Sequence, residues 1–228
     1  MNRLLWLTPV ITALALPASA QTILSLTSSG SATTSPDEVV AQFEIQATKP
    51  TASAAQQMVN QQVAKALSTA RSVQGITVTT SNYDTYSTTP DKQTKPSFTA
   101  QQSLTLVQSA ADGIPGKSFS DVLAKLQSDG LLLTTLKGDL SATGQQKLQQ
   151  QAVHNALLQL NEDAKTIAAT LNQKVVTLKS LNVDMGGGAV PPILPRGVMM
   201  AASAPQSVPG NMSTTANISA QIELGQTP

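Results

Sequence analysis

The hydrophobic pattern is clearest in Gln145–Asn172, the longest stretch with a single period and no interior Gly or Pro. Apolar residues form one stripe along it, and Gln, Glu and Lys fill the other side; the stripe comprises Ala152, Ala156, Leu160, Ala164 and Ala168, widened by Leu157, Ile167 and Leu171. This spacing predicts an amphipathic helix roughly 40 Å long. Because alanine side chains are small, we expect this helix to pack closely against a sheet formed by the beta-like segments before and after it.

Two further helices are predicted from the same kind of pattern. Thr51–Gln74 carries apolar residues at helical spacing and stops at Gly75, a residue type common just past helix C-termini. A shorter helix is predicted over Phe119–Gln127, where Ser118 and Asp121 form a near capping box.

Alternation of apolar and polar residues predicts the strands, because successive side chains of a strand point to opposite faces. A short first strand around Ile23–Leu26 is expected to end in the turn-rich stretch Ser28–Pro36. The other predicted strands are Val39–Ala47, a hairpin of Ile76–Tyr86 and Phe98–Gln108 around the polar loop Thr88–Ser97, then Leu131–Leu140, Val175–Val183 and Ser213–Leu224. The sequence thus predicts an α+β fold of order β-β-α-β-β-α-β-α-β-β, with mixed sheet(s), two long helices and one short helix.

The composition changes sharply at residues 185–212, which are rich in Gly, Pro and Met and have no hydrophobic period. Three successive glycines and five prolines cannot sustain a helix or a strand ladder; they are Gly186, Gly187, Gly188, Pro191, Pro192, Pro195, Pro205 and Pro209. We expect a long loop there, and the first cuts of a limited proteolysis within it.

Residues 1–20 have the three parts of a secretory signal peptide. Asn2-Arg3 is a short basic region, Leu4–Leu16 is apolar, and Ala18-Ser19-Ala20 is a small-residue cleavage site. The apolar run is too short for a transmembrane helix of about 20 residues. We therefore expect export to the periplasm or cell envelope, and a mature domain over residues 21–228 with no transmembrane segment.

Composition excludes several function classes. The chain has no cysteine, which excludes disulfides, thiol catalysis and Cys-based zinc sites. Of 14 Lys and Arg residues Arg3 leaves with the signal peptide, so 13 remain against 13 Asp and Glu, and no basic face for nucleic acid is implied. Only 12% of residues are charged, against roughly 25% in typical domains. Because a surface with so few charges repels copies of itself only weakly, it permits self-association.

Two polar motifs could suggest chemistry but have simpler interpretations. Asp37 and Glu38 could be paired catalytic carboxylates, yet adjacent residues of a strand point to opposite faces, which favours a solvated turn. Ala111–Ser118 has the strand-before, helix-after context of a phosphate-binding loop. However, Ala111 replaces the first glycine and Pro115 removes a backbone donor, which favours an ordinary helix start.

Several single residues could also have a chemical role, but each has a simpler structural interpretation. His154 is the only histidine, and its position just off the apolar stripe is typical of a partly exposed helix residue. Glu162 and Asp163 are about 100° apart around that helix, which indicates a solvated face. Tyr83 and Tyr86 could stack on a ligand, but aromatic residues also favour ordinary sheet positions.

Methionines gather in and beside the loop of residues 185–212. Met185, Met199, Met200 and Met212 could bind Cu(I), because thioethers are soft ligands. They could equally be adaptable contact residues or oxidation targets.

Four short features follow one another in a fixed order over nearly the whole mature chain. They are Pro36-Asp37 before the second strand, Gly75-Ile76 at a helix-to-strand junction, the alanine stripe of the long helix, and Pro209-Gly210 ahead of the last strand. In this order and spacing they resemble the SIMPL-domain (DUF541) family of bacterial exported and periplasmic proteins. The resemblance implies a mixed α/β fold, homo-oligomers that form rings or channels in some members, and a link to envelope or oxidative stress.

The family has no agreed catalytic site, so the resemblance assigns no catalytic, cofactor or metal residues. We expect an exported, non-enzymatic, oligomeric cell-envelope factor, possible contacts with other envelope proteins, and an interface that includes Leu194, Met199 and Met200 of the loop. Two alternatives stay open. One is a periplasmic copper-binding protein that uses the Met-rich loop, and the other is an uncharacterised hydrolase that depends on His154.

Protein recovered after export should begin at Gln21, because cleavage follows the small residues Ala18 and Ala20. N-terminal sequencing or intact mass of the exported protein measures this directly, and mature protein that retains Leu4–Leu16 would contradict it.

Overall fold

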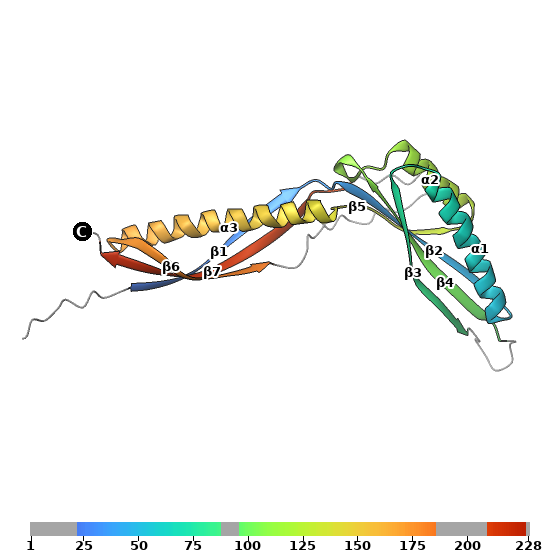
Figure 1. The fold of residues 1–228 in the computed structure, drawn as a ribbon, viewed down its shortest axis with the longest axis horizontal. Coiled ribbons are helices and arrows are strands. Elements are labelled where there is room, and N and C mark those ends of the chain that lie inside the picture. The colour runs from blue at the N-terminus through green and yellow to red at the C-terminus, as the bar shows by residue number, and fades with distance from the viewer. Residues whose placement is uncertain (1–21, 88–95, 186–208, 227–228) are drawn as a thin grey trace, which may run out of the picture.

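The computed structural model describes residues 22–87, 96–185 and 209–226, which form two lobes placed end to end in an elongated molecule (Figure 1). The strands are β1 (Thr22–Thr34), β2 (Glu38–Lys49), β3 (Ile76–Ser87), β4 (Phe98–Ser109), β5 (Leu132–Asp139), β6 (Gln173–Met185) and β7 (Met212–Gln226). The helices are α1 (Ala52–Arg71), α2 (Lys117–Ser128) and α3 (Ala142–Thr170), with a single 3-10 turn at Ala111–Gly113. The predicted α+β class and element order are confirmed.

The terminal lobe, as we call it, contains β1, α3, β6 and β7, and so draws on both ends of the described chain. Its sheet has the order β1-β7-β6 with antiparallel pairing throughout, and α3 covers one face (Figure 1). Every second residue of β7 faces α3 and is buried, including Ala216, Ile218 and Ala220. These residues and the buried stripe of α3 form one of two separate hydrophobic cores.

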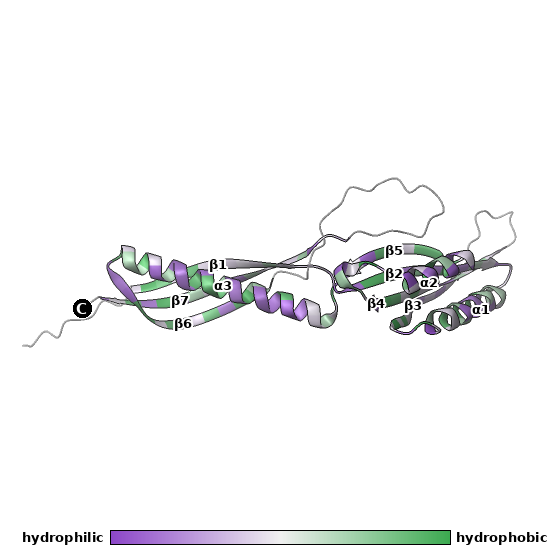
Figure 2. Ribbon diagram, turned by 90° about the horizontal axis from the view of Figure 1, so that it is seen from above, coloured by the Kyte–Doolittle hydropathy of each residue, from purple (hydrophilic) through white to green (hydrophobic). Residues whose placement is uncertain are grey.

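The inserted lobe contains the elements between β1 and α3. Its antiparallel sheet has the order β3-β4-β2-β5, and α1 and α2 pack on one face. Large side chains such as Phe43, Leu104 and Phe119 fill the second core, which shares no residue with the first. Hydrophobic residues are correspondingly dense along β2, β4 and β5 (Figure 2).

The alanine stripe brings α3 unusually close to β1. A Cβ atom added at Gly30 would lie 2.1 Å from the backbone nitrogen of Ala156 and 2.7 Å from the carbonyl oxygen of Ala152. The helix backbone therefore rests almost directly on the strand, as the small side chains predicted. The covering strands differ from the expectation, because β1 and β7 take the place of the preceding strand β5, which belongs to the other sheet.

Several predicted boundaries were wrong for identifiable reasons. The first strand does not end at Ser28 but runs to Thr34, because thirteen consecutive residues pair with β7. Ser118 does not cap α2, because the helix begins at Lys117, two residues before the predicted Phe119, with Gly116 as its N-cap. Asp121 pairs with Lys117 and does not close a capping box. The predicted end of α3 is nearly right, because the helix ends at Thr170 and Asn172 has a left-handed φ of 52°. The predicted end of α1 at Gln74 was wrong, because the helix ends at Arg71 with Ser72 as its C-cap, before the left-handed Gly75.

The close approach at Gly30 yields a stability prediction. Gly30→Ala should lower the free energy of unfolding of the terminal lobe by about 1–3 kcal/mol or more, because the new methyl group meets helix backbone that cannot rotate away. Urea unfolding followed by circular dichroism measures the change. Gly116→Ala is the matched control, since the nearest atom to its added Cβ is 3.9 Å away. Equal stability of both variants would show that α3 does not sit this close.

Candidate interaction surface

The candidate residues for catalysis or ligand binding lie on different elements of the structure. His154 is exposed on α3, and Tyr83 and Tyr86 lie on β3 with about two fifths of their surface exposed, 42% and 43%. Asp112 belongs to Ala111–Ser118, the stretch with the context of a phosphate-binding loop, and lies in the 3-10 turn with a φ of 56°. Among the described residues, no three His, Cys, Asp or Glu side chains meet in a way that could hold a metal ion.

Asp163 does not belong to a fully solvated face, contrary to the prediction. Its carboxylate accepts hydrogen bonds from Ser28 Oγ at 2.7 Å and from Gln159 Nε2 at 2.8 Å. Ser28 is buried on the α3 side of β1, so its hydroxyl needs an acceptor there. The spacing of Glu162 and Asp163 on the helix could not reveal this contact, because β1 approaches only in the folded chain.

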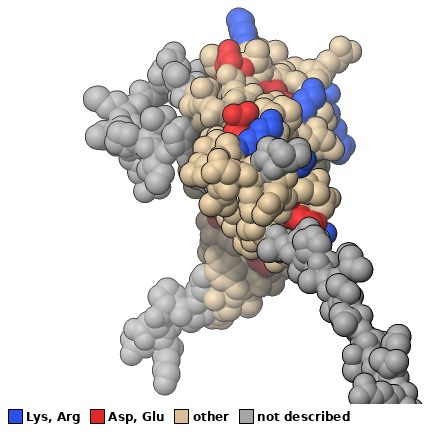
Figure 3. Space-filling model, turned by 90° about the vertical axis from the view of Figure 1, so that its left-hand side faces the viewer, with Lys and Arg blue, Asp and Glu red and all other residues tan. Residues whose placement is uncertain are grey.

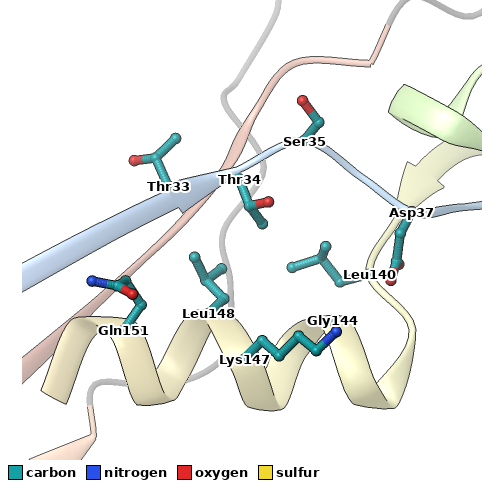
Figure 4. A pocket seen from close by; sticks show the side chains of 9 residues that line it. All are labelled: Thr33, Thr34, Ser35, Asp37, Leu140, Gly144, Lys147, Leu148 and Gln151. Carbon is teal, nitrogen blue, oxygen red and sulfur yellow. The ribbon is translucent and has the colours of Figure 1, made fainter. Parts of the chain in front are cut away.

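Asp37 occupies the junction between the lobes (Figure 4). Its backbone continues the ladder of the inserted lobe, with its N–H donating to the Asp139 carbonyl at 3.1 Å. Its carboxylate accepts from the Ser141 N–H at 2.6 Å and from Ser141 Oγ at 2.7 Å. The Ser141 oxygen in turn accepts from the Gly144 N–H at 3.0 Å and so caps α3. The interpretation of Asp37 as part of a solvated turn missed this cap.

The pKa values of two neighbouring carboxylates at the junction, Asp37 and Glu38, are shifted in opposite directions. Loss of solvent around Asp37 raises its pKa, but hydrogen bonds from Ser141 and the positive charge of Lys147 outweigh this effect, so the pKa lies below its ordinary value. Burial raises the pKa of Glu38, helped by the negative charges of Asp139 and Asp37, although Lys137 opposes the shift.

A cavity of about 320 Å³ adjoins this junction, and Figure 4 shows the nine side chains around it. They are Thr33, Thr34, Ser35, Asp37, Leu140, Gly144, Lys147, Leu148 and Gln151. The Asp37 carboxylate is already engaged by Ser141, and no histidine lines the cavity to activate a hydroxyl. The arrangement therefore fits a structural junction better than a reaction centre.

A group of exposed apolar side chains lies on the terminal lobe beside α3. We call it the α3–β6 strip and define it as Leu157, Val175, Leu178, Leu181 and Val183. These five side chains are exposed by between 38% for Leu157 and 50% for Leu178. The pairing of β6 with the buried residues of β7 places its members on the α3 face of the sheet, and green segments recur along β6 in Figure 2.

A shallow cavity of about 220 Å³ runs between α3 and β6 within this strip. Its lining is almost wholly apolar and consists of Leu157, Leu160, Asn161, Ala164, Val175, Leu178, Leu181 and Ile222. The charged pair of Lys179 and Glu223 lies on the opposite face of the same sheet, where Glu223 neighbours Thr177. At the end of the molecule shown in Figure 3, Lys, Arg, Asp and Glu are interspersed among uncharged residues.

The interface residues predicted from sequence, Leu194, Met199 and Met200, lie outside the described residues. Of the other methionines considered for copper, Met212 is buried in the terminal-lobe core and Met185 packs against it. The strip was missed because the exposed residues of β6 look, in sequence, like those of any half-buried strand.

Two lobes, each a sheet with helices on one face, define an α+β protein in which no helix of the described residues is long and apolar enough to cross a membrane. The SIMPL family model, described as a protein of unknown function (DUF541), matches residues 24–223. The chain belongs to the SIMPL family. A comparison with curated proteins finds no match.

The junction yields a pH prediction. The folded-state pKa of Asp37 is lowered, so its stabilising contribution is fully present above the ordinary value of 3.8 and is lost as pH falls through the folded-state pKa. Asp37→Asn should therefore lower the free energy of unfolding at neutral pH, and the difference from the unsubstituted protein should shrink as pH falls below 3.8 and disappear only below the folded-state pKa. Ser141→Ala should cost about 0.5–2 kcal/mol as a lost helix cap.

Urea unfolding at several pH values measures both changes. Asp121→Asn is the control, because that carboxylate pairs only with Lys117 on an exposed helix surface. A pH-independent effect of Asp37→Asn would contradict the assignment.

Proposed function

We propose that this SIMPL-family protein is an exported, non-enzymatic cell-envelope factor that acts as a homo-oligomer and serves in envelope or oxidative stress. Residues 1–20 support export, and the family resemblance supports the envelope role. The observation that carries the oligomer is the α3–β6 strip, an apolar surface along an edge strand that α3 covers only in part.

Burial of the strip against a second copy would be favourable through the hydrophobic effect alone, without ion pairs. Each large side chain of this type gains about 1.5–3 kcal/mol on full burial, and the five members are partly exposed at present. The mature chain has equal numbers of basic and acidic residues, so copies do not repel one another strongly.

The edge of β1 offers a second contact of a different kind. Three edge strands carry features that discourage pairing with another chain: bulges interrupt β6 at Val176 and Lys179, β3 near Asn82, and β5 at Thr134. In contrast, β1 pairs with β7 without interruption and contains no charged residue and no proline. Among the described residues, no strand pairs with its outer edge. Main-chain pairing there would supplement the strip.

The oligomer predicts a specific response to substitution. Leu178→Asp should reduce the mass of the assembly in sedimentation velocity, because a charge would have to be buried in the apolar contact. Leu132→Asp is the matched control, since Leu132 is 62% exposed on β5 in the other lobe. Raising the salt concentration should leave the unsubstituted assembly intact, because salt screens ion pairs and not apolar burial.

Two outcomes would contradict the proposal. A monomer at micromolar concentration would remove the oligomer altogether. An assembly equally stable in both variants would show that copies associate through another surface, such as the loop that contains Leu194 and Met199.

A further inference from the structure

The two lobes have little to hold them at one angle. Their cores share no residue and their sheets share no strand. Within the described ranges, no helix or strand of one lobe packs extensively against an element of the other. The relative orientation therefore depends on the few residues where the chain passes between them.

Part of that junction is apolar and tightly packed. Pro36, in the segment that links β1 to β2, is buried beside Gly113 and Gly138 of the inserted lobe, and Pro209, which precedes β7, lies against the same two glycines. A Cβ atom added at Gly138 would lie 2.6 Å from Pro209 Cβ, and one at Gly113 2.8 Å from Pro36 Cβ. These contacts involve few atoms and no hydrogen bonds. They therefore permit a change of the angle between the lobes more readily than hydrogen bonds do.

The hydrogen bonds that join the two lobes at the junction are made by the side chain of Asp37. Backbone bonds fix Asp37 to the inserted lobe on both sides, since the Ala110 N–H donates to its carbonyl at 3.0 Å and its own N–H donates to Asp139. Its carboxylate holds Ser141, the residue that starts α3 of the terminal lobe, by two hydrogen bonds. The N-terminus of a helix carries partial positive charge, which adds to this attraction.

The space around the carboxylate fits this role. Gly144 in the first turn of α3 lies so close that an added Cβ would be 2.6 Å from Asp37 Oδ2 and 3.0 Å from its Cγ. No larger residue at this position would leave the carboxylate where it is. Gly144 therefore lets Asp37 reach the helix terminus, and its substitution should displace the carboxylate without removing either hydrogen-bonding partner.

From this geometry we infer that Asp37 and Ser141 form a releasable latch that fixes the angle between the two lobes, and that the lobes turn about the Pro36, Gly138 and Pro209 contacts when the latch opens. The latch acts within one copy of the chain and is independent of self-association. Because the α3–β6 strip lies on the terminal lobe, the latch would also decide where the inserted lobe stands relative to a neighbouring copy.

The absence of cysteine makes the inference directly measurable. Gln61→Cys on α1 and His154→Cys on α3 are exposed positions, one in each lobe, for a pair of spin labels. Pulsed electron paramagnetic resonance then gives the distance distribution between the lobes of the mature protein. Dilution with unlabelled protein removes distances between copies.

Three variants and one control test the latch. Asp37→Ala and Ser141→Ala remove its hydrogen bonds, and Gly144→Ala displaces the carboxylate while both partners stay in place. Asp163→Asn is the control, because Asp163 accepts from Ser28 within the terminal lobe alone. We expect one narrow distance distribution for the unsubstituted protein and for the control, and a broader or shifted one for the three variants.

Circular dichroism of each sample confirms that both lobes remain folded, and Gly144→Ala keeps the test decisive if Asp37→Ala fails to fold. The inference is overturned if the distributions of the folded variants superimpose on that of the unsubstituted protein. It is also overturned if the unsubstituted protein already shows a broad distribution, since the latch would then fix nothing.

Discussion

The antiparallel pairing of β1 with β7 is the contact on which the rest of the structure depends. It joins Thr22 to Leu224 and Thr34 to Met212, residues from opposite ends of the chain, in one uninterrupted ladder. The inserted lobe is formed entirely between these two strands in sequence, and α3 can bury its stripe only after they have met. A local helix of this length gains most of its stability from such packing.

The position of α3 on that ladder explains where apolar surface remains exposed. The helix backbone rests on Gly30 of β1 and its stripe covers the alternate residues of β7. A single helix placed so far toward β1 covers β6, the third strand of the sheet, only in part. Leu178 and Leu181 consequently face the helix side of the sheet without being buried. The exposed strip thus follows from the same small residues that let α3 approach closely.

The junction shows how one carboxylate can serve two parts of a fold. Asp37 belongs by its backbone to the sheet of the inserted lobe and by its side chain to the start of α3. Its neighbour Glu38 points elsewhere and has its pKa shifted in the opposite sense, because burial and two like charges surround it. Asp37, just before β2, and Glu38, its first residue, therefore differ in role.

The sequence by itself determined the elements and their order, because helical and strand periods, glycines at helix ends and the alanine stripe are local signals. Asn172 directly follows the end of α3 in the structure, as the sequence predicts. Only the tertiary structure decided which strands cover α3, that the elements divide into two cores, that Asp163 meets Ser28, and that Asp37 meets Ser141. The two hydrogen-bonded contacts join residues more than a hundred positions apart, and no periodic pattern encodes them. They arise when strands far apart in the chain pair: the pairing of β1 with β7 completes the sheet on which Ser28 meets α3, and the pairing of β2 with β5 places Asp37 beside Ser141.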